Sequence, residues 1–464
     1  MAKHKAYDTD AAKRVTLGKI ISIFKDLGSV KLYAKCLAPN DNSKNQPYLG
    51  GHLTDLAFIP TGEPIPSPTT STKSRDPKRQ IKYQVPTDFS WVDADGSVYR
   101  APNTKLIYYP QYPEVRLSGF LLGSQVDAGE WMNRYKKGTS LGRWLIIGVT
   151  PKKMVYGYLV TPECQLSNEL ENTKFLDIGS VFGQIDLDGI GVTDTRAALL
   201  NKLLQIHHMG WIFGQRLKGD GSRIDYKALN GGGYTLESLL DIIPNGISQP
   251  DYLGWEVKQF GVSEFPQKSP KPTTLMAPEP DGGIYKTRGA TEFVRAFGYP
   301  DKSGIPDRIN FGGRHSAKAF CKATSLTLHV EGFDEEAGQI TDASGAITLR
   351  NDEGTLAVSW SFAKIMNHWK RKHAQAVYVP CMMRPAGKGR EYHYGSQIEL
   401  GVGTDFEMFL LATLKRAVYY DPGIKLENAS SDKSKLKVRS QFRANHRDLP
   451  TLYSDMYLID LLES

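Results

Sequence analysis

The spacing of apolar residues changes near residue 185, and this change limits the folds open to the chain. Before it, short runs rich in Val, Ile, Leu and Tyr are separated by turn residues, which is typical of strands in a β-barrel or sandwich. After it, Leu199, Leu200, Leu203 and Ile206 recur at helical spacing, and helices alternate with strands. The pattern predicts two domains, with the boundary between about 170 and 190.

Within the first part we expect strands over residues 30–35, 52–60, 105–109, 115–122, 144–149 and 155–160. The segment 61–79, rich in Pro, Ser and Thr with a basic end, is predicted to be a long exposed loop. In the second part a stripe of four apolar residues predicts a buried helix face: Phe362, Ile365, Met366 and Trp369. The basic run 370–373 after it predicts a solvated surface, and residues 376–379 predict a buried strand.

The charge is also unevenly divided. Residues 1–165 hold 23 Lys+Arg and 14 Asp+Glu, a net of +9, whereas residues 166–464 hold 35 and 36, a net of −1. A basic first domain suits a polyanion such as nucleic acid. A basic surface that only confers solubility is an equally good interpretation of the charge alone.

Several classes of protein are disfavoured. No apolar stretch approaches the roughly 20 residues that span a bilayer, and the N-terminus lacks the apolar core of a signal peptide, so we expect a cytoplasmic protein with no membrane partner. Cys36, Cys164, Cys321 and Cys381 include no Cys-x-x-Cys pair, which argues against a zinc, iron–sulfur or disulfide site and predicts reduced, buried thiols. The phosphate-loop, nucleophile-elbow and zinc-helix motifs are missing from the sequence.

One segment combines residues suited to phosphodiester chemistry. Three glycines at 231–233 are predicted to end the preceding element, and Thr235 to cap a short helix with a buried leucine stripe and Glu237 off that stripe. Further on, Leu253, Trp255 and Val257 alternate with Gly254, Glu256 and Lys258. This alternation predicts a strand whose polar face carries Glu256 and Lys258 side by side.

Asp251 has the wrong parity for that polar face, so it either precedes the regular strand or is swung round by a bend at Gly254. With a bend, Asp251, Glu256, Lys258 and Glu237 would form a cluster of three carboxylates and one amine. Carboxylate oxygens are ligands that Mg²⁺ prefers, and Lys258 would position or polarise the attacking water. An exposed strand with a Glu–Lys ion pair is the structural alternative.

Gly233-Tyr234-Thr235-Leu236-Glu237 followed by Pro250-Asp251-x4-Glu256-x-Lys258 resembles the active-site signature of the MvaI/BcnI group of restriction endonucleases, relatives of the mismatch-repair nickase MutH in the PD-(D/E)xK superfamily. Segments at 298–302, 310–313, 359–362 and 439–453 agree, and the resemblance covers roughly residues 190–464. It implies an α/β, MutH-like nuclease domain in which Asp251 and Glu256 hold Mg²⁺, Lys258 is the catalytic lysine and Glu237 is an extra helix carboxylate.

The resemblance further implies that bases are read by the C-terminal part of the chain, as in members that cut CCWGG or CCSGG sites. Arg439, Gln441 and Arg443 are the predicted contacts, since Arg suits guanine and Gln suits adenine in the major groove and their alternation aims them the same way along a strand. A solvated basic tail explains the neighbouring lysines equally well.

The first domain has a fainter likeness, to the effector-binding domain of EcoRII, a B3-like β-barrel that holds a second DNA copy. It rests on Tyr33 to Asp41, Gly50-Gly51-His52 and Ile59-Pro60. The segment from Tyr109 to Phe120 would be a recognition segment of that barrel. The predicted DNA contacts of this domain are Arg116, Lys78 and Arg79.

We therefore expect a mostly β, B3-like DNA-binding domain over residues 1–180 and a MutH-like catalytic domain over residues 181–464. The predicted function is Mg²⁺-dependent, site-specific cleavage of double-stranded DNA, of type IIE if the first domain binds an effector copy. A monomer or weak dimer with a companion DNA methyltransferase is expected. The alternatives are a methylation- or mismatch-directed nicking enzyme and an inactive DNA-binding regulator.

Overall fold

A computed structural model describes residues 3–39, 45–68, 81–162, 164–179, 181–188, 194–228, 230–242 and 252–463. The chain divides into two compact units, unit 1 (residues 1–194) and unit 2 (residues 195–464), and each is described by itself. The division falls later than the predicted boundary at residue 180, because a strand at Phe182–Ile185 pairs with Lys31–Cys36 inside unit 1. None of the helices in the described ranges is both long enough and apolar enough to cross a membrane.

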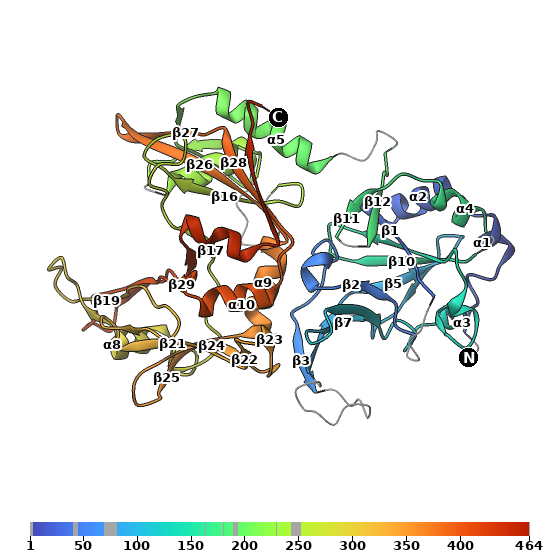
Figure 1. The fold of residues 1–464 in the computed structure, drawn as a ribbon, viewed down its shortest axis with the longest axis horizontal. Coiled ribbons are helices and arrows are strands. Elements are labelled where there is room, and N and C mark those ends of the chain that lie inside the picture. Colours follow the sequence, from blue (N-terminus) through green and yellow to red (C-terminus); the bar gives the residue numbers. More distant parts are fainter. Residues whose placement is uncertain are drawn as a thin grey trace. The chain divides into compact units, whose positions relative to one another are not determined.

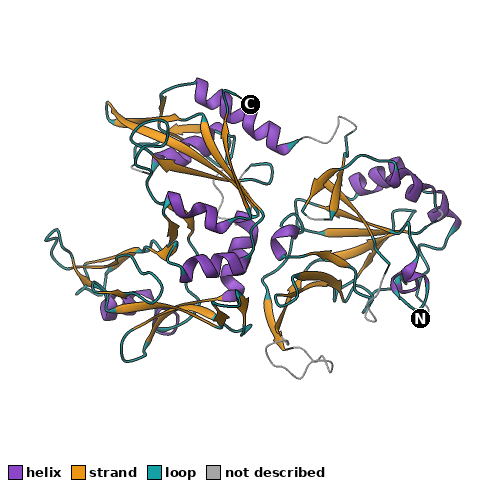
Figure 2. Cartoon of the chain, in the orientation of Figure 1, coloured by secondary structure: helices purple, strands orange, loops and turns teal. Residues whose placement is uncertain are grey.

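Unit 1 is strand-rich, with short helices (Figure 2). Its helices are α1 (Asp10–Arg14), α2 (Leu17–Asp26), α3 (Gly129–Met132), α4 (Gln165–Glu171) and the 3₁₀ helices η1 (Leu53–Leu56) and η3 (Lys137–Thr139). Its strands are β1 (Lys31–Cys36), β2 (Tyr48–Gly50), β3 (Ile65–Pro68), β4 (Ile81–Pro86), β5 (Phe89–Val92), β6 (Val98–Arg100), β7 (Lys105–Tyr109), β8 (Glu114–Ser118), β9 (Trp144–Val149), β10 (Val155–Val160), β11 (Leu176–Ile178) and β12 (Phe182–Ile185). They form a seven-stranded sheet, β11-β12-β1-β9-β10-β5-β6, and a five-stranded sheet, β2-β8-β7-β4-β3.

Most strands predicted for unit 1 are present, but two segments differ. Residues 52–60 contain η1 instead of a strand, because the backbone N–H of His52 donates to Asp55 Oδ2 (3.1 Å) and turns the chain. In the predicted loop 61–79, Ile65–Pro68 is a strand that pairs with β4. The basic end of that segment, with Lys78 and Arg79, lies outside the described residues.

Unit 2 combines helices with sheets (Figure 1), and it has a larger share of helix than unit 1. Its main sheet has six strands. Its helices are α5 (Thr195–His208), α6 (Gly231–Leu239), α7 (Ile284–Thr287), α8 (Ala290–Phe297), α9 (Phe362–His373), α10 (Phe406–Leu414) and the 3₁₀ helix η4 (His446–Leu452). The strands of the main sheet are β13 (Ile212–Phe213), β16 (Glu256–Gly261), β26 (Gln375–Ala386), β27 (Gly389–Tyr394), β28 (Gln397–Val402) and β33 (Asp455–Asp460). The order is β13-β27-β26-β28-β33, and β16 runs parallel to β26.

Smaller sheets complete unit 2. They are β14 (Gln215–Leu217) with β15 (Arg223–Asp225); β17 (Thr273–Met276), β32 (Phe442–Ala444) and β29 (Val418–Tyr420); β18 (Tyr299–Pro300), β19 (Arg308–Gly312), β30 (Gly423–Glu427) and β31 (Lys435–Lys437); β20 (Phe320–Cys321), β21 (Leu326–Glu331), β24 (Ala346–Arg350) and β25 (Leu356–Ser361); and β22 (Phe333–Asp334) with β23 (Gln339–Ile340).

Two helices cover one face of the main sheet. Leu199, Leu203 and Ile206 of α5, together with Leu236 of α6, share a buried core with the apolar side chains of β16 and β26. The predicted stripe on α5 is therefore confirmed, as is the buried stripe of α9. All four cysteines are free, but only Cys164 and Cys381 are buried, so the burial predicted for Cys36 and Cys321 is wrong.

Candidate active site

The glycines before the site begin a helix and do not end one. Helix α6 starts at Gly231, where a β-carbon would lie 2.5 Å from Tyr392 Oη, and the Tyr394 hydroxyl donates to the Gly232 carbonyl (2.7 Å). A side chain at residue 231 would therefore clash with β27. Thr235 is buried within the helix, not at its cap, and its hydroxyl accepts from the backbone N–H of Gln215 (3.1 Å).

A tight turn leads into the strand that carries the acidic residue. Backbone hydrogen bonds join Tyr252 and Trp255 in both directions, and the turn residues Leu253 and Gly254 have φ of 48° and 92°. Strand β16 therefore starts at Glu256, and Leu253 is 43% exposed instead of forming part of a buried strand face. A bend at Gly254 is thus present, although Asp251 lies outside the described residues.

The alternation along β16 separates its apolar and charged side chains. Trp255 and Val257 belong to the core under α5 and α6, so Glu256 and Lys258 project from the opposite face. Glu256 is 0% exposed, and its Oε1 accepts a hydrogen bond from Lys258 Nζ. Burying an ionised carboxylate costs free energy unless the carboxylate is paired with a cation. The Glu256–Lys258 pair is therefore a buried ion pair, and the alternative of an exposed strand with a Glu–Lys ion pair does not apply.

A second lysine, distant in sequence, reaches the same carboxylate. Lys372 Nζ at the end of α9 lies 3.4 Å from Glu256 Oε1. The basic run 370–373 was predicted to be a solvated surface, which is wrong for Lys370 and His373, both of them buried. The apolar stripe of α9 explains this, since Lys370 follows Met366 and His373 follows Trp369 at the helical spacing of four, on the buried face.

A network of buried polar side chains lies next to the site and includes His373, which follows Lys372 on α9. His373 Nε2 contacts the Leu275 carbonyl oxygen (2.9 Å), and its Nδ1 contacts Tyr453 Oη (3.2 Å), which in turn bonds to Tyr378 Oη (2.9 Å). Burial, reinforced by the nearby Lys258 and Lys372 ammonium groups, holds the pKa of His373 well below its ordinary value. His373 is therefore a neutral support at neutral pH and adds no further positive charge.

The structure thus brings together Glu256, Lys258 and Lys372. Glu237 lies half-buried on α6, which packs against β16 on the side of Val257. Its place in the site, like that of Asp251, remains a prediction. The chemistry of the group is that of a hard oxygen donor flanked by two cations, which suits the binding and hydrolysis of a phosphodiester.

The predicted base contacts differ in their surroundings. Arg439 is exposed, and its Nε donates to Gln441 Oε1 (3.2 Å). Gln441 is buried, while the Arg443 guanidinium binds Asp421 Oδ2 (2.7 Å) and the Pro272 carbonyl (2.8 Å). The regular strand here covers only Phe442–Ala444, so the three side chains do not line up along one strand as expected.

In unit 1, Arg116 lies on β8 and is largely enclosed. Its Nη2 pairs with Glu114 Oε2 (2.9 Å), and its Nη1 donates to the Gln46 carbonyl (3.0 Å). Among the predicted DNA contacts of this unit, Arg116 alone lies within the described ranges.

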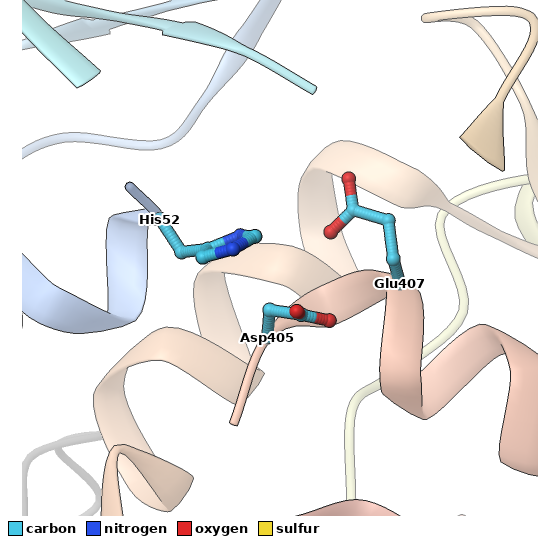
Figure 3. A group of neighbouring side chains, drawn as sticks. All are labelled: His52, Asp405 and Glu407. Atoms are coloured by element: carbon cyan, nitrogen blue, oxygen red, sulfur yellow. The ribbon is translucent and has the colours of Figure 1, made fainter. Parts of the chain in front are cut away.

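Two further carboxylates lie at the start of α10, where Figure 3 shows Asp405 and Glu407. Asp405 Oδ1 accepts from the backbone N–H of Met408 (2.6 Å) and caps the helix, and Glu407 lies in its first turn. Acidic side chains stabilise a helix N-terminus, which accounts for both positions. His52, drawn in the same view, belongs to unit 1 and precedes η1.

Comparison with known proteins gives the class of this fold and site. Residues 200–453 match the model of a family of restriction endonucleases, enzymes that hydrolyse DNA. The match spans more than half of the chain, and the chain belongs to this family, the MvaI/BcnI restriction endonuclease family. It is accordingly a type II, sequence-specific DNA endonuclease, as the resemblance predicted.

Solved structures of one restriction endonuclease are also similar to the chain. The complex of MvaI with its cognate DNA substrate has a TM-score of 0.43 and 18% identity, covering 58% of this chain and 99% of that chain. MvaI in the absence of DNA has a TM-score of 0.32 and 16% identity with the same coverage, 58% and 99%. Among curated proteins, no relative matches this chain.

Proposed function

We propose that the chain cleaves double-stranded DNA with Mg²⁺ at a site formed by Glu256, Lys258 and Asp251. The observation that carries the proposal is the buried Glu256 carboxylate with two lysine ammonium groups at one oxygen. Restriction endonucleases generally use divalent metal ions, and one buried carboxylate with a second acid nearby in sequence fits the few protein ligands that Mg²⁺ takes. The domain is proposed to be MutH-like, of the PD-(D/E)xK type.

The roles of the residues follow from their chemistry. Glu256 and Asp251 would hold Mg²⁺, which when bound stabilises negative charge on the phosphate and on the leaving oxygen. Lys258 would orient the attacking water and offset charge that develops on the phosphate. Glu237 would add a carboxylate from α6.

Lys372 is proposed as a positioning residue. It lies on α9, 116 positions from Glu256 in the sequence, and its Nζ contacts Glu256 Oε1. The carboxylate is therefore held by a second element besides its own strand. Lys372 also places a second positive charge beside the carboxylate.

For unit 1 we propose a B3-like domain that binds an effector copy of the DNA, as in type IIE enzymes, so that two DNA copies are bound. Its basic composition and its two sheets support this assignment. The target is proposed to resemble CCWGG or CCSGG, with Arg439 on a guanine and Gln441 holding Arg439. A companion DNA methyltransferase, a cytoplasmic location and a monomer or weak dimer complete the proposal.

The test is digestion of plasmid DNA with and without Mg²⁺, followed by run-off sequencing of the products. We expect cleavage of both strands at one short sequence, and a single nicked strand would instead indicate a nicking enzyme. Lys258→Ala should slow cleavage by more than about a hundredfold while leaving DNA binding within about twofold. The matched control is Lys268→Ala, which removes the exposed Glu264–Lys268 pair and should cleave normally. Cleavage by Lys258→Ala at the wild-type rate would refute the proposal.

A further inference from the structure

Unit 1 contains a cavity of about 300 Å³ that both of its sheets help to line. Lys35 comes from β1 of the seven-stranded sheet, and Arg143 lies immediately before β9 of the same sheet. Tyr48 on β2 and Arg116 on β8 come from the five-stranded sheet. The remaining wall is largely apolar and includes Leu37 and Met132.

Among the described residues, Lys35 is enclosed without a carboxylate to balance its charge. Its side chain is 7% exposed, and its ammonium nitrogen lies 5.7 Å from the centroid of the Tyr48 ring. Within the described part of the chain no hydrogen-bond acceptor or carboxylate contacts this nitrogen. A cation over an aromatic ring recovers only part of the hydration that burial removes.

The two arginines reinforce the positive potential. The Arg143 guanidinium donates from its three nitrogens to the carbonyls of Ser140 (2.7 Å), Trp131 (2.7 Å) and Ala38 (2.8 Å). Neutral carbonyls satisfy its hydrogen bonds and leave its charge in place. Arg116 shares its charge with Glu114, and among the described residues that line the cavity the charged side chains are all cationic.

We propose that this cavity binds a phosphate group. An anion there would neutralise the buried Lys35 ammonium, accept hydrogen bonds from it and meet the field of Arg116 and Arg143. The apolar wall would accommodate the sugar or other organic part that the phosphate carries. The same chemistry is offered by a phosphodiester of DNA and by a free nucleotide. The inference does not rest on the nuclease site of unit 2.

The test uses the full chain and three probes: inorganic phosphate, a nucleoside 5′-monophosphate and a short DNA duplex, each measured by calorimetry. Lys35→Met should weaken the binding of the recognised probe by at least about tenfold. The matched control is Lys31→Met, an exposed lysine on the same strand, which should bind as the wild type does.

The pattern across probes identifies the source of the phosphate. Weaker binding of phosphate and mononucleotide in Lys35→Met would support a free nucleotide, and weaker binding of the duplex alone would support a DNA phosphodiester. Weaker phosphate binding with unchanged duplex binding in Lys35→Met would reject only the proposed effector function. The inference is overturned if the wild type binds none of the probes or if Lys35→Met binds all of them normally.

A second measurement does not depend on a variant. Reductive methylation of wild-type Lys35, followed by mass spectrometry, should slow in the presence of the recognised probe, while methylation of Lys31 should not. Equal protection of both lysines, or of neither, would contradict binding in the cavity.

Discussion

Both units enclose lysine side chains beside a sheet, but they balance the charge differently. In unit 2, Lys258 and Lys372 meet at the buried carboxylate of Glu256. In unit 1, Lys35 meets an aromatic ring and, among the described residues, no carboxylate. A buried cation with an internal partner contributes to a prearranged site, whereas a buried cation without such a partner is expected to bind an anionic ligand. Removing the charge of Glu256 in unit 2 should therefore lower the stability of the protein, whereas removing the charge of Lys35 in unit 1 should raise it.

The largest effect is expected at Glu256. Glu256→Gln keeps the shape of the side chain but leaves two lysines without their shared charge, and the free energy of unfolding should fall by about 3 kcal/mol. Urea denaturation measures this, and cleavage of DNA should be lost as well. The exposed Glu264→Gln is the control and should change stability by less than about 0.5 kcal/mol. A Glu256→Gln protein as stable as the wild type would show that the carboxylate is not paired as described.

A smaller effect is expected at Lys372. Lys372→Ala should lower kcat by about tenfold and raise the Mg²⁺ concentration needed for half-maximal rate, because the carboxylate loses one of its two supports. Lys364→Ala, on the first turn of the same helix, is the control and should behave as the wild type. Recovery of the rate in Lys372→Arg would show that the positive charge positions the carboxylate, whereas no recovery would show that the packing of the lysine side chain matters. A changed KM for DNA with unchanged kcat would instead place Lys372 in DNA binding.

At Lys35 we expect the removal of a charge to stabilise the protein. Burial lowers the pKa of Lys35 from 10.5 to about 8, so the folded protein binds this proton less tightly than the unfolded chain does. Stability of the wild type should therefore rise with pH between about 8 and 10.5, and below pH 8 the cost of the buried charge is present in full. Lys35→Met should be the more stable protein at pH 7, and its advantage should shrink towards pH 10. A less stable Lys35→Met would show that the ammonium has a partner.

The smallest effect concerns the cysteines of the two units. A hydrogen bond from His315, followed by its charge, lowers the pKa of Cys321 in unit 2 to about 6, whereas burial raises the pKa of Cys36 in unit 1. At pH 7 iodoacetamide should label Cys321 faster than the more exposed Cys36, and the rate at Cys321 should rise through pH 6 and then level off. Peptide mass spectrometry measures both sites in one sample. Faster labelling of Cys36 would contradict the assignment.

Patterns within one element were predictable from the sequence. The period-two alternation placed Glu256 and Lys258 on one face, and the stripe on α9 predicted the burial of Trp369, because each depends only on local geometry. Predictions from neighbouring residues were wrong where a side chain distant in sequence determines the conformation. The glycines at 231–233 were predicted to end the preceding element, but they begin α6, where Gly231 leaves room for the Tyr392 hydroxyl of β27.

Contacts between distant elements were not predictable in this way. Lys372 lies 116 positions from Glu256, and only the parallel pairing of β16 with β26 brings the end of α9 to the carboxylate. One signal was present: extending the apolar stripe of α9 by three positions reaches Lys372. A lysine at the end of a buried stripe indicates a partner on the facing strand, but the sequence does not say which strand that is.

The parallel pairing of β16 with β26 also sets when the proposed active site can first form. Pairing of Glu256 with Ala376 closes a loop of more than a hundred residues, and the entropy lost in closing such a loop slows folding. On the ribosome, a chain that has emerged only as far as α9 carries β16 without this partner strand and without a placed Lys372. The Glu256–Lys372 contact can therefore form only after β26 has been synthesised, 116 positions and more after Glu256.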